Sequence, residues 1–336
     1  AIVFILILAS FPLFFFLTEY KPDEIEEAIK YRNNREIEFK NTYTITTFNI
    51  GFCGLDRAQD FFLDGGHGAG AKTREERFDN LLAITSIIES LNSDFYVFQE
   101  IDTHGSRSSD INQVEHIASE MPNHNLYFAY NIKSKWIPFP LMHPMGSVYS
   151  GILTISKIPF SDSKRIALKG DLPLPNRFFL PKRCMQVSTF ELKGKTLYII
   201  NVHLSAYDKQ SSLRFKQFQQ VMNYAEKLYN PKQNHIIIGG DFNMGFDPNI
   251  VYDHHPSWFS KMPFETVPKS FKTAYDTGVN TMRSNNQPYI KTVNFEAVID
   301  GFIVSDNLKI IDVKNHDYEF EHSDHNPVTL TFQSKR

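Results

Sequence analysis

From residue 43 onward, apolar and polar positions alternate between the two-residue period of β-strands and the 3.6-residue period of α-helices. Residues 74–91 repeat apolar side chains such as Leu81 and Ile88 at helical spacing, and Thr73 with Glu76 forms a capping-box start. The pattern predicts helices over residues 74–91, 111–121 and 213–229, and strands over residues 42–49, 95–100, 126–131, 150–156, 184–192, 196–204, 235–243, 298–305 and 327–332.

The order of these elements predicts one large α/β domain over residues 42–336. Lys193-Gly194-Lys195 separates two strand-like runs, which indicates a hairpin, while helices separate other strands. Apolar residues make up 42% and aromatic residues 14% of the 336 residues, so the chain can fill a large core. Mixed strands and hairpins with helices between them favour a core formed by one sheet packed on another.

The N-terminal residues 1–17, AIVFILILASFPLFFFL, carry no charge. As a helix they would reach roughly 26 Å, slightly less than the ~30 Å of a bilayer core. A signal-peptide core and a buried core helix are alternatives, but the run is long and no A-x-A cleavage site follows it. We expect residues 1–18 to form a transmembrane anchor (or the remnant of a signal anchor) and residues 19–41 to form a stalk.

The charge pattern supplies two further expectations. The segment after the apolar run, EYKPDEIEEAIK, is acidic, which fits the outer side of a cell membrane that the chain crosses once. The formal net charge of −3 argues against a protein that binds nucleic acid through a broad basic face, although it is compatible with a local basic groove.

Cys53 and Cys184 lack metal-ligand spacing, so we expect buried free thiols or one disulfide.

Polar residues with catalytic potential lie at the ends of six predicted strands. Each has an ordinary explanation when taken alone, such as a turn residue, a surface acid or a satisfied core histidine. In α/β sheets, however, ligands bind in the crevice outside the strand ends, where loops converge. We therefore interpret the whole set as one site: Asn49, Glu100, His203, Asp241, Asn243, Asp300, Asp324 and His325.

These residue types suit phosphoryl chemistry with a hard cation. Carboxylates with an amide oxygen and no sulfur ligand fit Mg²⁺ or Mn²⁺, whereas zinc would favour more His or Cys. A histidine oriented by a carboxylate fits a general base. The combination predicts metal-assisted attack of water at phosphorus.

The sequence also resembles the endonuclease/exonuclease/phosphatase superfamily. The blocks TFNIG (47–51), QE (99–100), NVHL (201–204), GGDFN (239–243), ID (299–300) and SDHNP (323–327) occur in that order. The superfamily includes deoxyribonuclease I-like nucleases, abasic-site endonucleases, neutral sphingomyelinases and inositol polyphosphate 5-phosphatases. The resemblance spans residues 43–332 and implies a four-layer α/β sandwich of two packed mixed β-sheets flanked by helices.

On the metal side, the resemblance implies that Glu100 is the principal ligand and that Asn49 helps to hold metal or phosphate. Asp324 would orient the site or bind a second metal.

On the catalytic side, the resemblance implies that His325 activates the attacking water and that Asp300 fixes its tautomer. Asp241 and Asn243 would position the nucleophile and the phosphoryl group, and His203 would stabilise the charged transition state. Asn243 and His203 would thereby contact substrate. A histidine at position 203 makes the chain resemble the deoxyribonuclease I-like, sphingomyelinase and 5-phosphatase members more than the abasic-site enzymes.

Residues 64–73, DGGHGAGAKT, do not form a nucleotide-binding P-loop, because Ala71 follows Gly70 where the motif needs Lys. We interpret them as a mobile loop near Asn49 and over the cleft. Lys72 and Arg74 of this loop would meet an anionic substrate.

Two segments, residues 133–146 and 172–183, mix aromatic, proline and basic residues. We interpret their aromatic side chains as core plugs; the alternative is that they are exposed and contact lipid or a substrate chain, with basic neighbours facing phosphate. The residues concerned are Trp136, Phe139, Phe178 and Phe179 and the basic Lys182 and Arg183.

Three hypotheses for function follow. The first is a membrane-anchored, Mg²⁺-dependent phosphodiesterase or phosphatase acting on a lipid headgroup or a small phosphoester. The second is an extracellular nuclease of the deoxyribonuclease I type, which would need a basic groove. The third is an inactive binding module that keeps the fold alone, against which the complete set of site residues argues.

Overall fold

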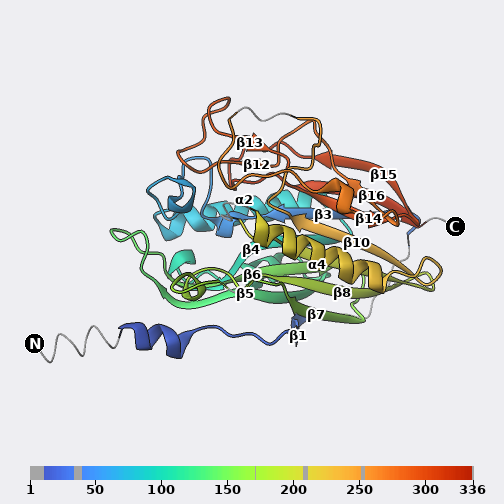
Figure 1. Cartoon of the computed structure of the whole chain (residues 1–336), viewed down its shortest axis with the longest axis horizontal. Coiled ribbons are helices and arrows are strands. Elements are labelled where there is room, and N and C mark those ends of the chain that lie inside the picture. The colour runs from blue at the N-terminus through green and yellow to red at the C-terminus, as the bar shows by residue number, and fades with distance from the viewer. Residues whose placement is uncertain (1–10, 34–39, 171, 207–210, 251–253, 335–336) are drawn as a thin grey trace, which may run out of the picture.

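The computed structural model describes residues 11–33, 40–170, 172–206, 211–250 and 254–334. Two large mixed sheets pack face to face, and helices cover their outer faces (Figure 1). This arrangement confirms the predicted α/β sandwich.

The first sheet has the strand order β1-β7-β8-β9-β10-β14-β11. Within it, β9 and β10 are parallel and the other neighbours are antiparallel. Its strands are β1 (Ile25–Glu27), β7 (Asp162–Ala167), β8 (Cys184–Leu192), β9 (Lys195–His203), β10 (Asn234–Asp241), β11 (Phe271–Ala274) and β14 (Asp300–Ser305).

The second sheet has the order β15-β16-β3-β4-β6-β5-β2, with β3 and β4 parallel. Its strands are β2 (Ile29–Arg32), β3 (Tyr43–Asn49), β4 (Phe95–His104), β5 (Asn125–Ile137), β6 (Gly146–Ser156), β15 (Leu308–Asn315) and β16 (Val328–Ser334). A separate short pair, β12 (Met282–Arg283) and β13 (Glu296–Ala297), lies outside both sheets.

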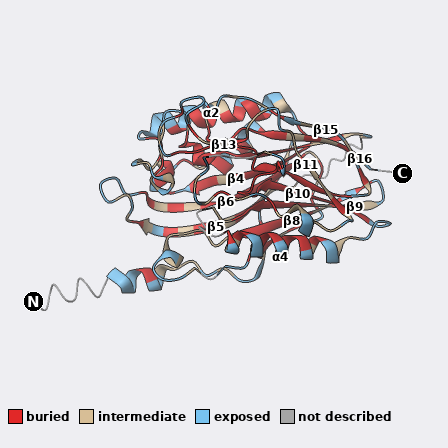
Figure 2. Cartoon of the chain, turned by 45° about the horizontal axis from the view of Figure 1, so that its top comes forward, coloured by how far each residue is buried: buried red, intermediate tan, exposed pale blue. Residues whose placement is uncertain are grey.

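Buried side chains form one layer between the sheets and one under each set of helices. Between the sheets, Val97 and Leu330 of the second sheet pack with Ile199 and Phe302 of the first. Such interleaved apolar residues supply most of the favourable free energy of folding. Figure 2 shows this buried interior running the length of the molecule.

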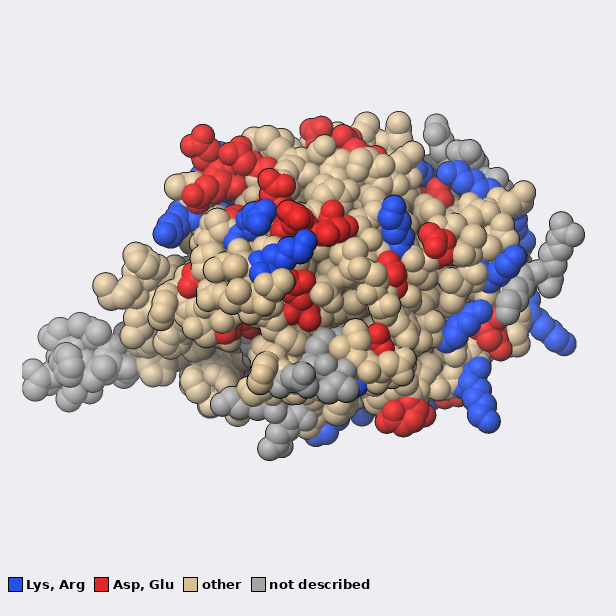
Figure 3. All heavy atoms as spheres, turned by 90° about the horizontal axis from the view of Figure 1, so that it is seen from above, with Lys and Arg blue, Asp and Glu red and all other residues tan. Residues whose placement is uncertain are grey.

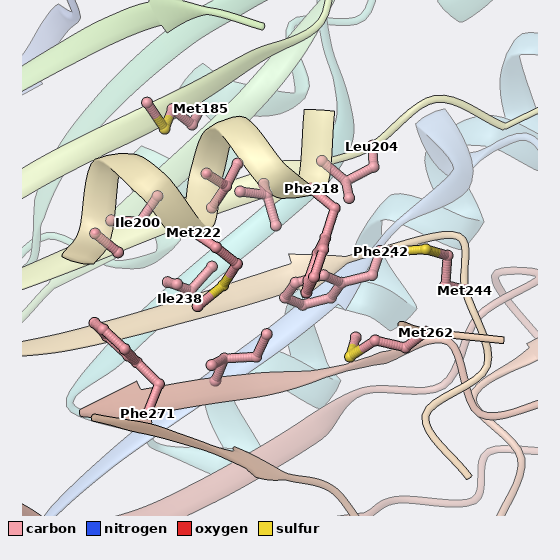
Figure 4. Packing of buried hydrophobic residues seen from close by; sticks show 14 of the residues in the cluster. Met185, Ile200, Leu204, Phe218, Met222, Ile238, Phe242, Met244, Met262 and Phe271 are labelled. Carbon is pink, nitrogen blue, oxygen red and sulfur yellow. The ribbon is translucent and has the colours of Figure 1, made fainter. Parts of the chain in front are cut away.

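Helix α4 (Ser212–Leu228) covers the first sheet. Its Phe218 and Met222 point into a cluster with Ile238 and Phe242 of the sheet side (Figure 4). This packing supports β10 immediately before the end of the strand that carries Asp241.

Helices α2 (Arg74–Leu91) and α3 (Gln113–Glu120) cover the second sheet. The capping box predicted at the start of α2 is present: Glu76 N–H donates to Thr73 Oγ1 at 3.1 Å, and Thr73 N–H donates to Glu76 Oε2 at 3.0 Å. The helix begins and ends where the sequence pattern predicts.

The N-terminal region differs in part from the expected stalk. Residues 25–27 and 29–32, within the segment 19–41, form β1 and β2 at the edges of the two sheets. Residues 11–18 are helical. Residues 1–10 of the expected anchor lie outside the described residues.

None of the helices in the described part of the chain combines the length and the apolar character that crossing a membrane requires.

Cys53 and Cys184 are both buried and both free, which agrees with the expectation of buried free thiols.

Candidate active site

The registers of β9, β10 and β14 place three candidate residues side by side at one end of the first sheet. Asp241 is the register partner of His203 on parallel β9 and of Asp300 on antiparallel β14. Gly240 allows this close approach, because a Cβ atom there would lie 1.9 Å from the carbonyl oxygen of Val202. All three polar side chains are almost completely buried.

His325 reaches this strand end from the turn before β16. Its Nδ1 lies 2.8 Å from Asp300 Oδ2, and its Nε2 lies 3.8 Å from Asp241 Oδ2. Burial alone would lower the pKa of His325, but the charge and hydrogen bond of Asp300, with the charges of Asp241 and Asp324, outweigh it and raise the pKa. Asp300 is itself fixed because Thr281 Oγ1 accepts its backbone N–H at 3.1 Å.

Asn49, at the end of β3, joins the second sheet to this group. Its Nδ2 donates to Asp241 Oδ2 at 3.0 Å and lies 3.4 Å from His325 Nε2. Its Oδ1 accepts the N–H of Gly51 at 3.1 Å, and its backbone carbonyl accepts the Ser323 hydroxyl at 2.9 Å. The two sheets therefore meet at one hydrogen-bonded cluster.

Glu100 lies at an irregularity in β4. The pairing with β6 shifts register between Phe98 and Ile101, and Glu100 has a φ of 53°. A bulge of this kind redirects a side chain, and here the carboxylate lines the cleft. Burial and then the negative charge of Asp324 raise the pKa of Glu100.

Asp324 also lines the cleft and accepts a hydrogen bond of 2.6 Å from Asn285 Nδ2. Gly51 packs against it, since a Cβ atom on Gly51 would lie 2.8 Å from Asp324 Oδ1. Because Gly51 also has a φ of 49°, the site requires glycine at this position.

His203 and Asn243 complete the floor of the cleft. His203 Nε2 lies 3.3 Å from Asp241 Oδ2 and 3.9 Å from Glu100 Oε1. Burial lowers the pKa of His203 well below its usual range, and the positive charges of Arg183 and His325 lower it further. Asn243 Nδ2 donates to Leu204 O at 3.0 Å, and its N–H donates to Asp241 Oδ1 at 2.8 Å.

The cleft has a volume of about 780 Å³ and is lined by seven of the eight residues that we predict for the site. The eighth, Asp300, is fully buried behind His325. Lys72 and Arg74, the predicted substrate contacts, are exposed near the start of α2 and do not line it. Asp64 of the same loop does line it, as does Arg183. Lys182 instead lies 3.5 Å from Glu19.

Three further residues support the site and were not predicted from the sequence. Asn285 holds Asp324, and Thr281 holds the backbone of Asp300. Arg107 lines the cleft, binds Asp102 at 2.6 Å and lies 4.1 Å above the Phe52 ring. Asn285 and Thr281 come from irregular chain far from their partners in sequence, so no local pattern indicates their role.

Among the described residues, two groups of side chains could hold a cation. Asp241, Asp300 and His325 have ligand atoms within 4.8 Å of one another. In that group, however, the direct bond between His325 and Asp300 already accounts for the arrangement. Glu100 and Asp324 face the same cleft and repel each other, which a divalent cation between them would offset.

A family model and solved structures are similar to this chain. The family model described as "Endonuclease/Exonuclease/phosphatase family" matches residues 46–325. No curated protein matches the sequence.

Solved structures share the fold at low sequence identity. The endonuclease/exonuclease/phosphatase from Beutenbergia cavernae DSM 12333 is 14% identical, with a TM-score of 0.63, covering 88% of this chain and 72% of that one. TDP2 from Caenorhabditis elegans is 17% identical, with a TM-score of 0.55, covering 87% and 74%. TDP2 from D. rerio, complexed with single strand DNA product, is 14% identical, with a TM-score of 0.56, covering 88% and 100%.

Proposed function

The chain belongs to the endonuclease/exonuclease/phosphatase family, and from this premise we propose that it is a divalent-metal-dependent hydrolase of phosphoester bonds. The observation that carries the proposal is the buried pair of His325 and Asp300, 2.8 Å apart, in which His325 lines a cleft that Glu100 and Asp324 also line. A general base, a fixed tautomer and a hard-cation site are the parts that hydrolysis at phosphorus requires.

Glu100 and Asp324 would hold the cation, Mg²⁺ or Mn²⁺, and Asn49 would support it. Carboxylate oxygens in a cleft open to water suit these ions, which keep several water ligands. When bound, the cation would supply a positive charge that stabilises the phosphoryl oxygens.

His325 would take a proton from the attacking water. Asp300 accepts the Nδ1–H, which leaves Nε2 with a lone pair on the side of Asp241 and Asn49. The water oxygen would form a bond to phosphorus as the bond from phosphorus to the leaving oxygen breaks. The leaving oxygen would then take up a proton, and His325 would return its own proton to solvent.

Asp241, Asn243 and His203 would position the reacting groups. Asp241 lies between both histidines and is fixed by Asn49 and by the Asn243 backbone. The low pKa keeps His203 neutral, so it can donate one hydrogen bond toward a phosphoryl oxygen without adding a buried charge.

We propose a lipid headgroup or a small phosphoester as substrate. Apolar side chains such as Ile137, Phe139 and Leu172 line the cleft beyond the polar floor, which favours a substrate with an apolar part. The uncharged sequence of residues 1–17 supports the further proposal of a single-pass anchor in the cell membrane, with the catalytic domain outside the cytoplasm.

Nucleic acid is the second candidate substrate. Lys169, Arg183 and Lys216 line the cleft and could meet phosphates, and D. rerio TDP2, similar in fold, was solved with single strand DNA product. Against this candidate, the face in Figure 3 mixes basic and acidic residues without a continuous basic band. An inactive binding module is the third candidate.

The test compares the wild type with His325→Ala and Glu100→Gln in Mg²⁺ or Mn²⁺, using bis-p-nitrophenyl phosphate, plasmid DNA and sphingomyelin vesicles. Glu89→Gln, which changes an exposed carboxylate on α2, is the control. We expect His325→Ala to lose activity by about 10²–10⁴-fold and Glu100→Gln to weaken metal binding in calorimetry.

The substrates separate the candidates. Hydrolysis of lipid or of the small diester without cleavage of DNA supports the first candidate. DNA cleavage that disappears in His325→Ala and falls steeply with salt supports the nuclease. A protein that neither binds the cation nor hydrolyses any of the three substrates would contradict the enzyme proposal and favour the binding module.

A further inference from the structure

Three segments that are distant in sequence form an exposed apolar surface beside the cleft. They are the helical residues 11–18, the tip of the β5–β6 hairpin and the loop before β8; Figures 1 and 2 show the hairpin projecting beyond the sheets at the end of the molecule where the N-terminal helix lies. We call this surface the apolar rim and define it by Phe16, Leu17, Phe139, Leu141, Met142 and Leu174, which are all exposed.

The rim is built on a packed base. Phe15 is only 5% exposed and contacts the rings of Trp136, Phe178 and Phe179 at centroid distances of 6.4, 5.8 and 4.9 Å. Glu19 then ties the same segments together, with Arg177 at 2.7 Å. The aromatic residues expected as core plugs therefore form a small satellite cluster, which holds the rim in place.

The outermost apolar side chains are not covered by this aromatic cluster. Leu141 is 78% exposed, Met142 is 85% exposed and Leu17 is 76% exposed. Each leaves apolar area in water that its neighbours do not cover, and a contiguous patch of this kind marks an interaction site.

The rim continues into the active-site cleft. Phe139 belongs to both, and Ile137 and Phe179, next to the rim, line the cleft wall. A surface that covers the rim therefore lies at the mouth of the cleft that contains His325.

The charges around the rim indicate the chemistry of its partner. Residues 11–22, 133–146 and 172–183 contain six basic residues and one acidic residue, a net +5 in a chain whose formal net charge is −3. The basic residues are Lys21, Lys133, Lys135, Arg177, Lys182 and Arg183, and the acidic residue is Glu19. Apolar side chains on segments with a net positive charge fit the interface of an anionic phospholipid bilayer.

The adjoining sequence favours the same partner. Residues 1–10, which lead into the rim, are apolar apart from Ser10 and carry no charge. A second copy of the chain or another protein would not need an uncharged extension at this place.

We propose that the apolar rim docks the catalytic domain on an anionic phospholipid bilayer, with Leu141 and Met142 inserted among the acyl chains and the cleft mouth at the headgroups. This inference goes beyond the anchor, because it fixes how the domain lies on the membrane. The role of this docking rests on the proposed function, since the docked cleft would receive lipid headgroups. The first test of the docking does not depend on activity.

The first test uses the full chain with Met142→Cys, labelled with a polarity-sensitive dye, and phosphatidylcholine vesicles with or without phosphatidylserine. The native cysteines are buried, so the introduced thiol is the accessible one. The matched control is Ile311→Cys, at an exposed apolar residue of β15 on the opposite edge of the second sheet from β5.

We expect the dye at position 142 to shift to shorter wavelength with the anionic vesicles and to be quenched by brominated acyl chains, while the dye at position 311 does neither. A dye at position 142 that stays in water on these vesicles would overturn the proposal. A shift without vesicles that grows with protein concentration would also overturn it and would indicate a second copy of the chain.

The second test uses Leu141→Glu combined with Met142→Glu, neither of which lines the cleft. We expect roughly a tenfold or larger loss of hydrolysis on anionic vesicles and unchanged hydrolysis of bis-p-nitrophenyl phosphate. Equal losses on both substrates, or no loss on vesicles, contradict docking through the rim. If the wild type hydrolyses neither substrate, the proposed function fails, while the dye measurement still decides the docking.

Discussion

At the scale of single residues, two carboxylates and one amide around His325 determine which of its nitrogens can take a proton. Asp300 lies 2.8 Å from Nδ1, while Nε2 faces Asp241 at 3.8 Å and the Asn49 amide at 3.4 Å. The short bond to Asp300 keeps the proton on Nδ1 and orients the ring. The backbone of Asp300 is in turn positioned by Thr281, whose Oγ1 accepts its N–H, and its side chain is fully buried.

Replacing Asp300 by Asn keeps the size of the side chain and removes its charge. Since the charge and hydrogen bond of Asp300 raise the pKa of His325, Asp300→Asn lowers that pKa. A general base must be neutral to act, so activity rises with pH through the pKa of His325, and the acidic limb of the kcat/KM profile moves to lower pH. We expect the plateau to fall by about 10²–10⁴-fold, because the ring loses its fixed tautomer.

The matched control is Asp312→Asn, an exposed carboxylate on β15. Its pH profile and plateau should match those of the wild type. An Asp300→Asn variant with a wild-type plateau, or with the acidic limb moved to higher pH, would show that His325 is not the base.

At the scale of elements, the sequence predicts the three long helices and the central strands of both sheets, but it misses β7 and β15 as well as the irregular backbone. Helix α2 and strand β8 begin and end as predicted, because capping residues and a hairpin turn mark their limits locally. The short edge strands β1, β2 and β11 were not predicted, since each has only a few residues and depends on a neighbour for its hydrogen bonds. The bulge at Glu100 also depends on pairing with β6.

The same distinction applies to the site. The residues at strand ends could be predicted because regular strands bring their ends to one edge of a sheet. Asn285 and Arg107 could not, because loop folding places them beside Asp324 and in the cleft. Lys72 and Arg74 show the reverse: their loop reaches the cleft through Asp64, while they remain at its exposed far end.

The capping box of α2 gives a prediction at this scale. Thr73→Ala removes the hydroxyl that accepts the Glu76 N–H, so we expect the free energy of unfolding to fall by about 1 kcal/mol. Urea unfolding measures the change. Ser86→Ala, at an exposed position within the same helix, should cause no loss, because alanine has the higher helix propensity. Equal stability of Thr73→Ala and the wild type would show that the box is dispensable.

At the scale of the whole molecule, each sheet carries part of the site. Strands β9, β10 and β14 of the first sheet carry His203, Asp241 and Asp300, whereas β3 and β4 of the second carry Asn49 and Glu100. The relative position of the sheets therefore sets the distance between the proposed metal ligands and the proposed base. Apolar packing alone defines that position loosely, because apolar contacts have little directionality.

A buried polar bridge between the sheets lies directly behind the site. Gln99 Nε2, next to Glu100, donates to Asn201 Oδ1 at 2.8 Å, and Asn201 Nδ2 donates to the backbone of Phe98 at 3.2 Å and Leu153 at 3.1 Å. Gln99 and Asn201 are both fully buried. Because hydrogen bonds have strict geometry, this bridge can fix the register between β4 and β9 where apolar side chains cannot.

We expect Asn201→Ala and Gln99→Ala each to lower the free energy of unfolding by about 2 kcal/mol, since each leaves a buried polar partner unpaired. The double variant should lose less than the sum, by about 0.5–3 kcal/mol, because the two residues share one interaction. Both single variants should also lower kcat, since Glu100 and His203 lose their fixed separation.

The control is Thr154→Val, which breaks a different hydrogen bond between the sheets, from Thr154 Oγ1 to Gln186 at 2.9 Å. It should lower the free energy of unfolding while leaving kcat unchanged. Strictly additive losses of stability, or equal effects of Thr154→Val and Asn201→Ala on kcat, would mean that the bridge contributes packing without setting the geometry of the site.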